Sequence, residues 1–227
     1  MEITPIARIR TDFRDKFGVP RQSGLAEALR GTVVFEPEYR NRDALRGIDG
    51  FTHLWLLWGF SENRRGGGEW SPTVRPPRLG GNERLGVFAT RSPYRPNPIG
   101  LSCVRLLAVR EDASLGPVLD VAGADMVDGT PIYDIKPYLP YTDCRGEAAG
   151  GFAAEAPEPL PVRCPDALLR ALPPEKREAL LSALALDPRP RYQDDPERAY
   201  GLSFAGYNVR FRVGHGAVTV EEIVKQT

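Results

Sequence analysis

The apolar positions in the first part of the chain fall into short runs separated by glycine and proline. Residues 3–10 alternate between apolar and polar side chains, residues 32–36 are mostly β-branched and apolar, and residues 51–60 are an almost continuous apolar and aromatic run. Such runs predict strands, and the third is typical of a strand buried on both faces. Further strands are predicted at residues 84–90, 101–110, 118–122 and 132–137.

Helical spacing is rare in this region and is limited to residues 41–48. Strands that follow one another without amphipathic helices between them favour an antiparallel sheet or barrel over a doubly wound fold. We therefore expect a mainly β protein in which residues 1–144 form an antiparallel β-barrel domain.

The remainder of the chain has a different pattern. Residues 145–162 are rich in Gly, Ala, Glu and Pro, which predicts a linker. Residues 174–186 begin with proline and carry leucines at helical spacing, which predicts an amphipathic helix. Residues 200–213 and 217–224 are expected to be two strands of a hairpin across residues 214–216. Residues 163–227 are thus expected to form a small α+β C-terminal domain.

Composition describes a globular protein with no overall charge. The 227 residues include 30 basic and 30 acidic side chains, so any nucleic-acid partner must be bound by a local patch. Of the basic residues 26 are arginine, which suits planar contacts with phosphate, although genome base composition explains the same bias. The three cysteines lack a Cys-x-x-Cys spacing, and the start of the chain lacks the features of a signal peptide, so we expect a reducing, cytoplasmic location without membrane segments.

Several familiar site motifs are missing. The glycines at 66–68 are not followed by a helix pattern, and Gly214 and Gly216 lie too near the end of the chain for a Rossmann-type nucleotide site. A hydrolase would need His53 or His215, for which a core histidine and a turn residue are the alternatives. These two histidines lie far apart in sequence, and no metal site is expected.

Basic residues are concentrated between residues 64 and 95. Seven arginines face two glutamates there, a local charge of +5, and Trp70 and Tyr94 lie among them. Guanidinium groups and exposed rings together suit single-stranded RNA, and a solvated basic surface is the alternative.

Two neighbouring segments hold the other unusual residues. Residues 90–100 place three prolines between Arg91, Arg95 and Asn97, which predicts a stiff loop that fixes these side chains. Residues 124–138 contain aspartates around a Gly-Thr-Pro turn, and turn formation is the alternative role for Asp128. Lys136 follows in an apolar strand, where an unpaired ammonium is costly.

Five strings occur in one order, at residues 17–22, 72–82, 86–92, 95–100 and 125–138. Together they resemble the bacterial tRNA N6-threonylcarbamoyladenosine methyltransferase family over about residues 3–142, and residues 187–192 and 207–212 resemble that family's C-terminal part. The resemblance implies methyl transfer from S-adenosylmethionine to N6 of the modified adenosine beside the anticodon of threonine tRNA. It also implies a donor site on the barrel and a homodimer with its pockets near the interface.

Site residues follow from this resemblance. The positions implied in donor binding are Pro20, Arg21, Gln22, Ser61, Glu62, Arg91, Leu101, Ala124, Asp125 and Gly129, of which Ser61 and Glu62 depart from the family's pattern. The positions expected to contact the anticodon stem-loop are Arg75, Arg78, Arg84 and Arg95. In the tail, Arg189, Arg191, Arg210 and Arg212 either add RNA contacts or belong to a domain that only stabilises the barrel.

The reaction itself suggests roles for four residues. A sulfonium donor carries a good leaving group, whereas an acylated N6 is a poor nucleophile, so a base should take its proton. Asp128 is the expected base, and Lys136 is expected to pair with Asp128 or with the substrate carboxylate. Asn97 is expected to read a base edge, and Tyr138 to stack on a base or donate a hydrogen bond. A non-catalytic adenosyl-binding or nucleotide-binding regulatory module is the alternative function.

Overall fold

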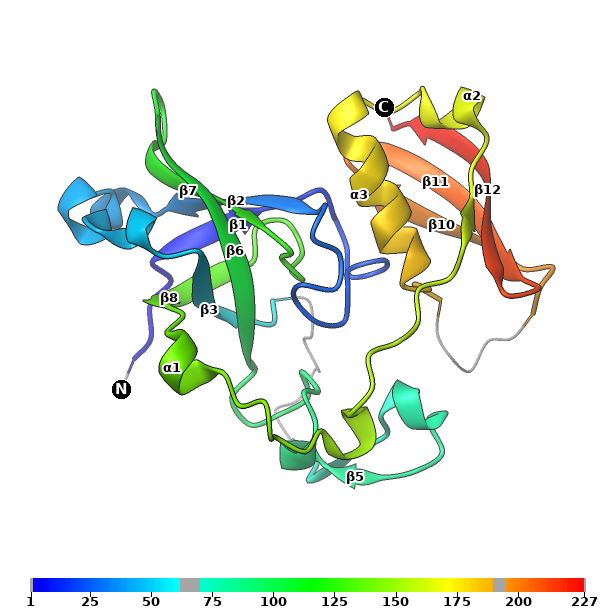
Figure 1. The fold of residues 1–227 in the computed structure, drawn as a ribbon, viewed down its shortest axis with the longest axis horizontal. Coiled ribbons are helices and arrows are strands. Elements are labelled where there is room, and N and C mark those ends of the chain that lie inside the picture. Colours follow the sequence, from blue (N-terminus) through cyan, green and yellow to red (C-terminus); the bar gives the residue numbers. More distant parts are fainter. Residues whose placement is uncertain (1, 62–69, 190–194, 227) are drawn as a thin grey trace.

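The computed structural model describes residues 2–61, 70–189 and 195–226 of the chain. Its N-terminal part is a closed barrel in which every pair of neighbouring strands is antiparallel, as the sequence predicts (Figure 1). The strands, in their order around the barrel, are β1 (Ala7–Arg10), β2 (Arg30–Phe35), β7 (Gly116–Ala122), β6 (Ile99–Asp112), β3 (His53–Gly59) and β8 (Pro131–Pro137).

Alternation of side chains explains the barrel core. In β3, Leu54, Leu56 and Trp58 point inward and are buried, whereas the residues between them are only half-buried on the outer face. The expectation that this strand is buried on both faces is therefore wrong, and an ordinary period of two replaces it. The inward side chains pack with residues such as Ile9, Val33, Val104, Leu119 and Ile132 into one apolar cluster.

The segments between the barrel strands contain short elements. A two-stranded ribbon of β4 (Thr73–Val74) and β5 (Leu85–Gly86) lies between β3 and β6. The strand expected at 84–90 is wrong beyond Gly86, because the Thr90 hydroxyl donates to the Val87 carbonyl at 2.9 Å and closes a 3-10 turn. The helix expected at 41–48 is replaced by 3-10 turns, which the structure places at Pro37–Tyr39, Arg42–Leu45 and Ile48–Gly50.

The C-terminal part is a small sheet covered by a helix. The strand order is β10 (Ala199–Phe204), β11 (Tyr207–Gly214), β12 (Ala217–Lys225) and β9 (Val162–Arg163), and β9 runs parallel to β12. The single strand expected at 200–213 is wrong, because Ala205 and Gly206 both have positive φ and turn the chain back between β10 and β11. The hairpin at residues 214–216 is confirmed.

Helix α3 (Pro174–Ala185) matches the predicted helix and begins with proline at its first turn. Its buried side chains, Ala179, Leu180, Ala183 and Leu184, share one face that packs into the C-terminal core. The other helices, α1 (Pro140–Asp143) and α2 (Asp166–Leu169), have a single turn each, and the residues between α1 and β9 include only a 3-10 turn at Gly151–Ala153. No helix of the described chain is long and apolar enough to cross a membrane.

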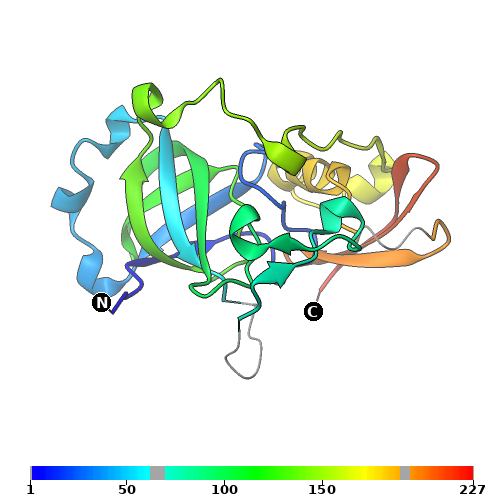
Figure 2. The same cartoon turned by 90° about the horizontal axis from the view of Figure 1, so that it is seen from below.

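The two parts are joined by more than the linker. The segment between β1 and β2, drawn in blue, loops across from the barrel toward α3 and the small sheet (Figures 1 and 2). Three of its residues, Phe13, Ala26 and Leu29, are buried in the C-terminal core and not in the barrel core. This segment, residues 12–29, is called the strap below.

Candidate functional site

Three predicted donor-binding residues from separate segments come together at one edge of the barrel. Arg91, from the proline-rich loop, donates a hydrogen bond from Nη1 to Oε1 of Gln22 in the strap. The Arg91 guanidinium also acts electrostatically on the carboxyl group of Asp125, which lies beyond the end of β7. Together with Ser23 and Ser102 described next, these residues form what we call the junction cluster.

Asp125 is held in a poorly solvated position. Ser102 donates from Oγ to Asp125 Oδ1 at 2.5 Å, and Trp58 donates from Nε1 to the same Ser102 oxygen at 2.9 Å. Desolvation raises the pKa of Asp125 to about 6, against the opposing effects of the Ser102 hydrogen bond, Arg91 and the Ser23 amide. The cluster therefore contains a carboxyl group whose charge is costly unless a cation is near.

Backbone contacts fix the cluster. The Cys103 amide donates to Ser23 Oγ at 3.2 Å, and the Gly24 amide donates to the Gly123 carbonyl at 2.9 Å. These bonds tie the strap to β6 and to the segment after β7. Sequence reasoning missed Ser23, Ser102 and Trp58, although Ser102 shows a signal: a polar residue at an inward-facing position of a β-strand requires a partner.

The other residues predicted to bind the donor differ in their burial and in their hydrogen-bond partners. Pro20 is buried, while Arg21 donates from Nη2 to the Arg189 carbonyl at 3.4 Å. Ala124 is buried beside Asp125, but Leu101 points outward from β6 and is 55% exposed. The remaining three are Gly129, whose amide bonds to the Ile9 carbonyl, Ser61, which is exposed just after β3, and Glu62, which lies outside the described residues.

The proline-rich loop is braced from within. Arg95 donates from Nη1 to the carbonyls of Thr90 and Ser92 at 3.0 and 3.2 Å, so this guanidinium supports its own loop. Asn97 is exposed, and its carbonyl accepts the Ile99 amide at 2.7 Å. The amide side chain of Asn97 thus stands at the start of β6 on a rigid base.

Asp128 occupies the turn before β8. Its Oδ1 accepts the Thr11 amide at 3.0 Å, and its own amide donates to the Phe13 carbonyl at 2.8 Å, so part of its role is to hold this turn. Among the described residues, Oδ2 accepts no hydrogen bond, and the residue is exposed. Among the described residues, no hydrogen bond or ion pair joins Asp128 to Asn97 within one chain.

Lys136 and Tyr138 lie on the outer face of the barrel. Lys136 pairs with Asp134 at 2.8 Å on an exposed surface, and the pairing with Asp128 is not observed. The ammonium carries no burial cost because this side of β8 faces solvent. The Tyr138 ring packs near Trp55 and His53, and desolvation with the nearby Cys144 thiol raises its pKa, which keeps the hydroxyl protonated as a donor.

Residues 70–90 form a flap that carries the predicted RNA-binding arginines. Arg75 and Arg84 are exposed, and Arg78 donates to the Glu155 carbonyl of the linker. Two exposed rings lie with them, since the centroids of Trp70 and Phe88 are 5.9 Å apart and Phe88 is 72% exposed. The flap thus presents guanidinium groups and ring faces together, although Arg64 and Arg65 of the basic cluster lie outside the described residues.

The tail arginines are engaged with carboxylates. Arg189 pairs with Asp187 at 3.0 Å, Arg210 with Glu221 at 3.4 Å, and Arg212 with Glu221 at 3.0 Å. Arg191 lies outside the described residues. These pairs favour the stabilising alternative for the C-terminal domain.

The two histidines lie at separate places in the fold, His53 at the start of β3 and His215 in the turn between β11 and β12. His53 contacts the neighbouring Thr52 hydroxyl through Nδ1 at 3.0 Å, and His215 is exposed at a hairpin turn. Among residues 2–61, 70–189 and 195–226, no group of three or more His, Cys, Asp or Glu side chains could hold a metal ion.

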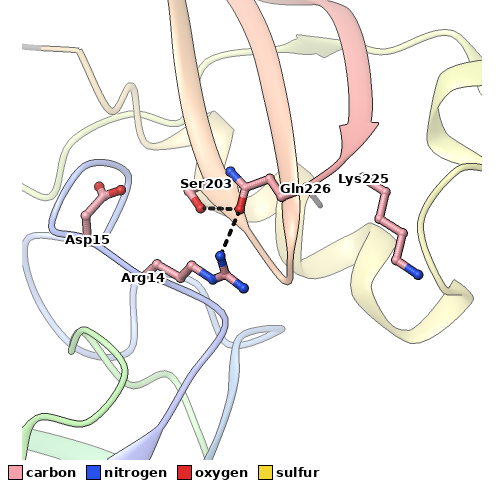
Figure 3. A pocket seen from close by; sticks show the side chains of 5 residues that line it. All are labelled: Arg14, Asp15, Ser203, Lys225 and Gln226. Atoms are coloured by element: carbon pink, nitrogen blue, oxygen red, sulfur yellow. Dashed lines mark hydrogen bonds between the residues drawn. The ribbon is translucent and has the colours of Figure 1, made fainter.

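Two surface pockets lie at the boundary between the two parts of the chain. One, of about 260 Å³, is lined by strap residues that include Pro20 and Arg21 and by the end of α3. The other, of about 520 Å³, is lined by Arg14, Asp15, Ser203, Lys225 and Gln226 (Figure 3). The second is open, and none of its lining residues belongs to the junction cluster.

Comparison with known proteins gives matches over most of the chain. The tRNA-methyltransferase O N-terminal domain matches residues 8–144, and the TrmO C-terminal domain matches residues 157–226. A tRNA (adenine(37)-N6)-methyltransferase of Escherichia coli strain K12 is 43% identical over 92% of this chain and 91% of its own length. A putative S-adenosylmethionine-dependent methyltransferase of Pseudomonas aeruginosa is 42% identical over 88% of this chain and 87% of its own. A crystal structure of TrmO from P. aeruginosa has a TM-score of 0.77 and 33% identity, and the alignment covers 99% and 97% of the two chains.

Proposed function

The chain belongs to the tRNA-methyltransferase O family, and from this premise we propose that it transfers a methyl group from S-adenosylmethionine to N6 of adenosine 37 of tRNA. The observation that carries the proposal is the 43% identity to the E. coli enzyme over nearly the full length of both chains. We further propose that the substrate base is threonylcarbamoyladenosine in threonine tRNA, in line with the sequence strings described above.

The junction cluster has the chemistry that this methyl donor requires. The methionine end of the donor carries an amino group, a carboxylate and a sulfonium, so its site should offer both an anion and a cation. Asp125 supplies a carboxylate with little solvent, and Arg91 supplies a guanidinium suited to a carboxylate. Gln22, Leu101, Ala124 and the strap residues Pro20 and Arg21 lie in the same segments. We propose that these residues hold the donor.

When bound, S-adenosylmethionine supplies an activated methyl group on a good leaving group. The protein then has to align the adenosine N6 with that methyl group and accept a proton. One N–C bond forms as the S–C bond breaks, and the N6 proton moves to a base. Asp128 is the proposed base because its carboxylate is exposed and Oδ2 accepts no bond from the described chain.

Roles for the remaining candidates follow from their positions. Asn97, on the braced loop, is proposed to read a base edge, and Tyr138 to stack on a base or donate from its hydroxyl. Lys136 is exposed and, within the part of the chain that the structure describes, pairs with Asp134 alone, so it is available to a substrate carboxylate by exchange of partner. Arg75, Arg78 and Arg84, with the exposed flap rings, are proposed to bind the anticodon stem-loop. Arg95 is proposed to act mainly through the loop that it braces.

We also propose a homodimer. Leu101 is 55% exposed on the outside of the barrel, so a donor pocket that includes it needs cover from another surface, and a second copy of the chain would supply it. The mass in solution by light scattering tests this, and a monomer at micromolar concentration would contradict it. Because its substrate is tRNA, we place the protein in the cytoplasm.

The reaction can be tested directly. Purified protein is incubated with S-adenosylmethionine and threonine tRNA that carries threonylcarbamoyladenosine, and the nucleosides are analysed by mass spectrometry. We expect a nucleoside heavier by one methyl group, and tRNA with unmodified adenosine 37 serves as the control for the proposed substrate base. Binding of S-adenosylmethionine without any methylated product would favour the regulatory-module alternative.

A further inference from the structure

One side of the strap is anchored in the C-terminal core by aromatic residues. Phe13 is 1% exposed and packs edge-to-face on Phe204 at a centroid distance of 5.4 Å. Phe17 stacks on both Tyr200 and Phe211 at 6.4 Å. These rings bury large apolar surfaces, so the strap moves with the C-terminal domain rather than as a free loop.

Polar contacts reinforce the same anchor. Lys176 of α3 donates from Nζ to both carboxylate oxygens of Asp12 at 2.7 and 2.8 Å, and the Ala205 amide donates to the Asp12 carbonyl at 2.8 Å. Arg14 and Ser203 both bond to Gln226 Oε1, at 3.4 and 3.2 Å, beside the end of β12 (Figure 3). The start of the strap is thus fixed to α3, to β10 and to the last strand.

Close packing continues at Gly18. A side-chain carbon at Gly18 would lie 2.3 Å from Leu202 Cδ1, and φ there is +88°. The 260 Å³ pocket is lined on one side by residues 16–21 of the strap and on the other by Ala183, Leu186 and Pro188. Pro20 and Arg21 lie between the Phe17 anchor and Gln22, and the Arg21 side chain donates to the Arg189 carbonyl at 3.4 Å.

Beyond Arg21, the strap is attached to the junction cluster. Gln22 accepts from Arg91, Ser23 accepts from the Cys103 amide, and Gly24 donates to Gly123. Only four residues separate Phe17 from Gln22. A displacement of the Phe17 ring is thus transmitted to the cluster over a short stretch of chain that is closely packed at both ends.

We propose that the C-terminal domain positions the methyl-donor site through the strap, with Phe17 as the positioning residue. The proposal rests on the donor site proposed above. Phe17 touches neither donor nor RNA in this scheme. It fixes the strap residues that do, and small errors in such positions are costly for binding and rate.

The test compares two truncations in the same core of the full-length protein. Phe17→Ala removes the anchor, and Leu168→Ala removes a half-buried side chain of the same core that lies outside the strap, on α2. Dissociation constants for S-adenosylmethionine are measured by calorimetry, together with melting temperatures and KM for tRNA. We expect Phe17→Ala to weaken donor binding at least about fivefold, and Leu168→Ala to change it less than about twofold at a comparable loss of melting temperature.

Conservative replacements of Phe17 separate an effect on the position of the strap from a general loss of stability. Phe17→Tyr keeps the stacked ring and should restore donor affinity to within about twofold of the wild type, while Phe17→Leu, a milder truncation that keeps the core filled, should fall between Tyr and Ala. KM for tRNA should change much less than donor affinity. If Phe17→Ala does not fold, Phe17→Leu and Leu168→Ala give the same comparison.

Two results distinguish the possible failures. If the position 17 and position 168 variants change donor affinity equally, or neither changes it, the strap has only a structural role and the inference is overturned. If the wild-type protein itself binds no S-adenosylmethionine, the proposed function is overturned, and the inference falls with it.

Discussion

Replacing Asp125 by asparagine should stabilise the protein at neutral pH and give no gain in acid. Burial raises the pKa of this carboxyl group from 3.8 to about 6. Each tenfold change in proton affinity corresponds to about 1.4 kcal/mol, so keeping Asp125 ionised costs the folded state about 3 kcal/mol at pH 7. The asparagine can still accept from Ser102, but its NH2 group faces the Ser23 amide, which removes about 1 kcal/mol of the gain.

The direction in which stability changes with pH follows from the number of protons that the folded and unfolded states bind. Between about pH 4 and pH 6 the folded state holds a proton on Asp125 that the unfolded state has lost, so this group makes stability fall as pH rises through that window. Below the unfolded pKa both states are protonated and the contribution disappears. Asp125→Asn should therefore be more stabilising at pH 7 than at pH 4 by about 2 kcal/mol.

Urea unfolding followed by circular dichroism at both pH values measures the difference. Asp134→Asn is the matched control, because Asp134 lies on the exposed face of β8, where it pairs with Lys136 and accepts the Ile135 amide at 2.9 Å. That control should change stability by less than about 1 kcal/mol at either pH. The reasoning is refuted if Asp125→Asn has the same effect at pH 4 and pH 7, or if it destabilises the protein more at pH 7.

Four further predictions concern the barrel, the junction cluster, the flap and the proposed base. Gly100→Ala should destabilise the barrel by about 1–3 kcal/mol in urea unfolding, because its new carbon would lie 2.3 Å from the Trp58 ring, and Gly86→Ala, with no neighbour within 4 Å, should not. Affinity for S-adenosylmethionine should rise with pH up to about pH 6 in the wild type, because a bound cation favours ionised Asp125, and calorimetry of Asp125→Asn should show a flat profile. Replacing Arg75, Arg78 and Arg84 of the flap by serine should lower the slope of the logarithm of the tRNA binding constant against the logarithm of the salt concentration by about two to three. Unchanged affinity at physiological salt would show that the flap is only a solvated surface. Asp128→Asn should lower the methylation rate at least about a hundredfold, and full activity in that variant would eliminate it as the base.

The barrel could be predicted from sequence because its signal is local. Runs of alternating or β-branched residues mark six strands within a few positions of their observed bounds, and proline at residue 174 marks the start of α3. The errors have equally local causes. Thr90 closes a turn where the hydrophobic pattern alone predicts a strand. Ala205 adopts a positive φ, which the presence of an alanine does not predict.

The site was less accessible to sequence reasoning, because its contacts join distant segments. The motif strings indicated Gln22, Arg91 and Asp125, which the fold brings together. Ser102 and Ser23 carry no motif and are recognised only when β6 and the strap are in place. The same holds for Phe13 and Phe17, whose partners lie almost two hundred residues further along the chain.

The position of β12 has a consequence for how the protein is made. This strand pairs with β11 on one side and β9 on the other, so the small sheet lacks an interior strand until residues 217–225 have been synthesised. Phe13 leaves the ribosome early, yet its burial depends on that sheet. During translation the barrel sequence is complete while Phe13 and Phe17 still lack their partners, and a nascent chain stalled or truncated before residue 217 would display two unburied aromatic rings to chaperones and proteases.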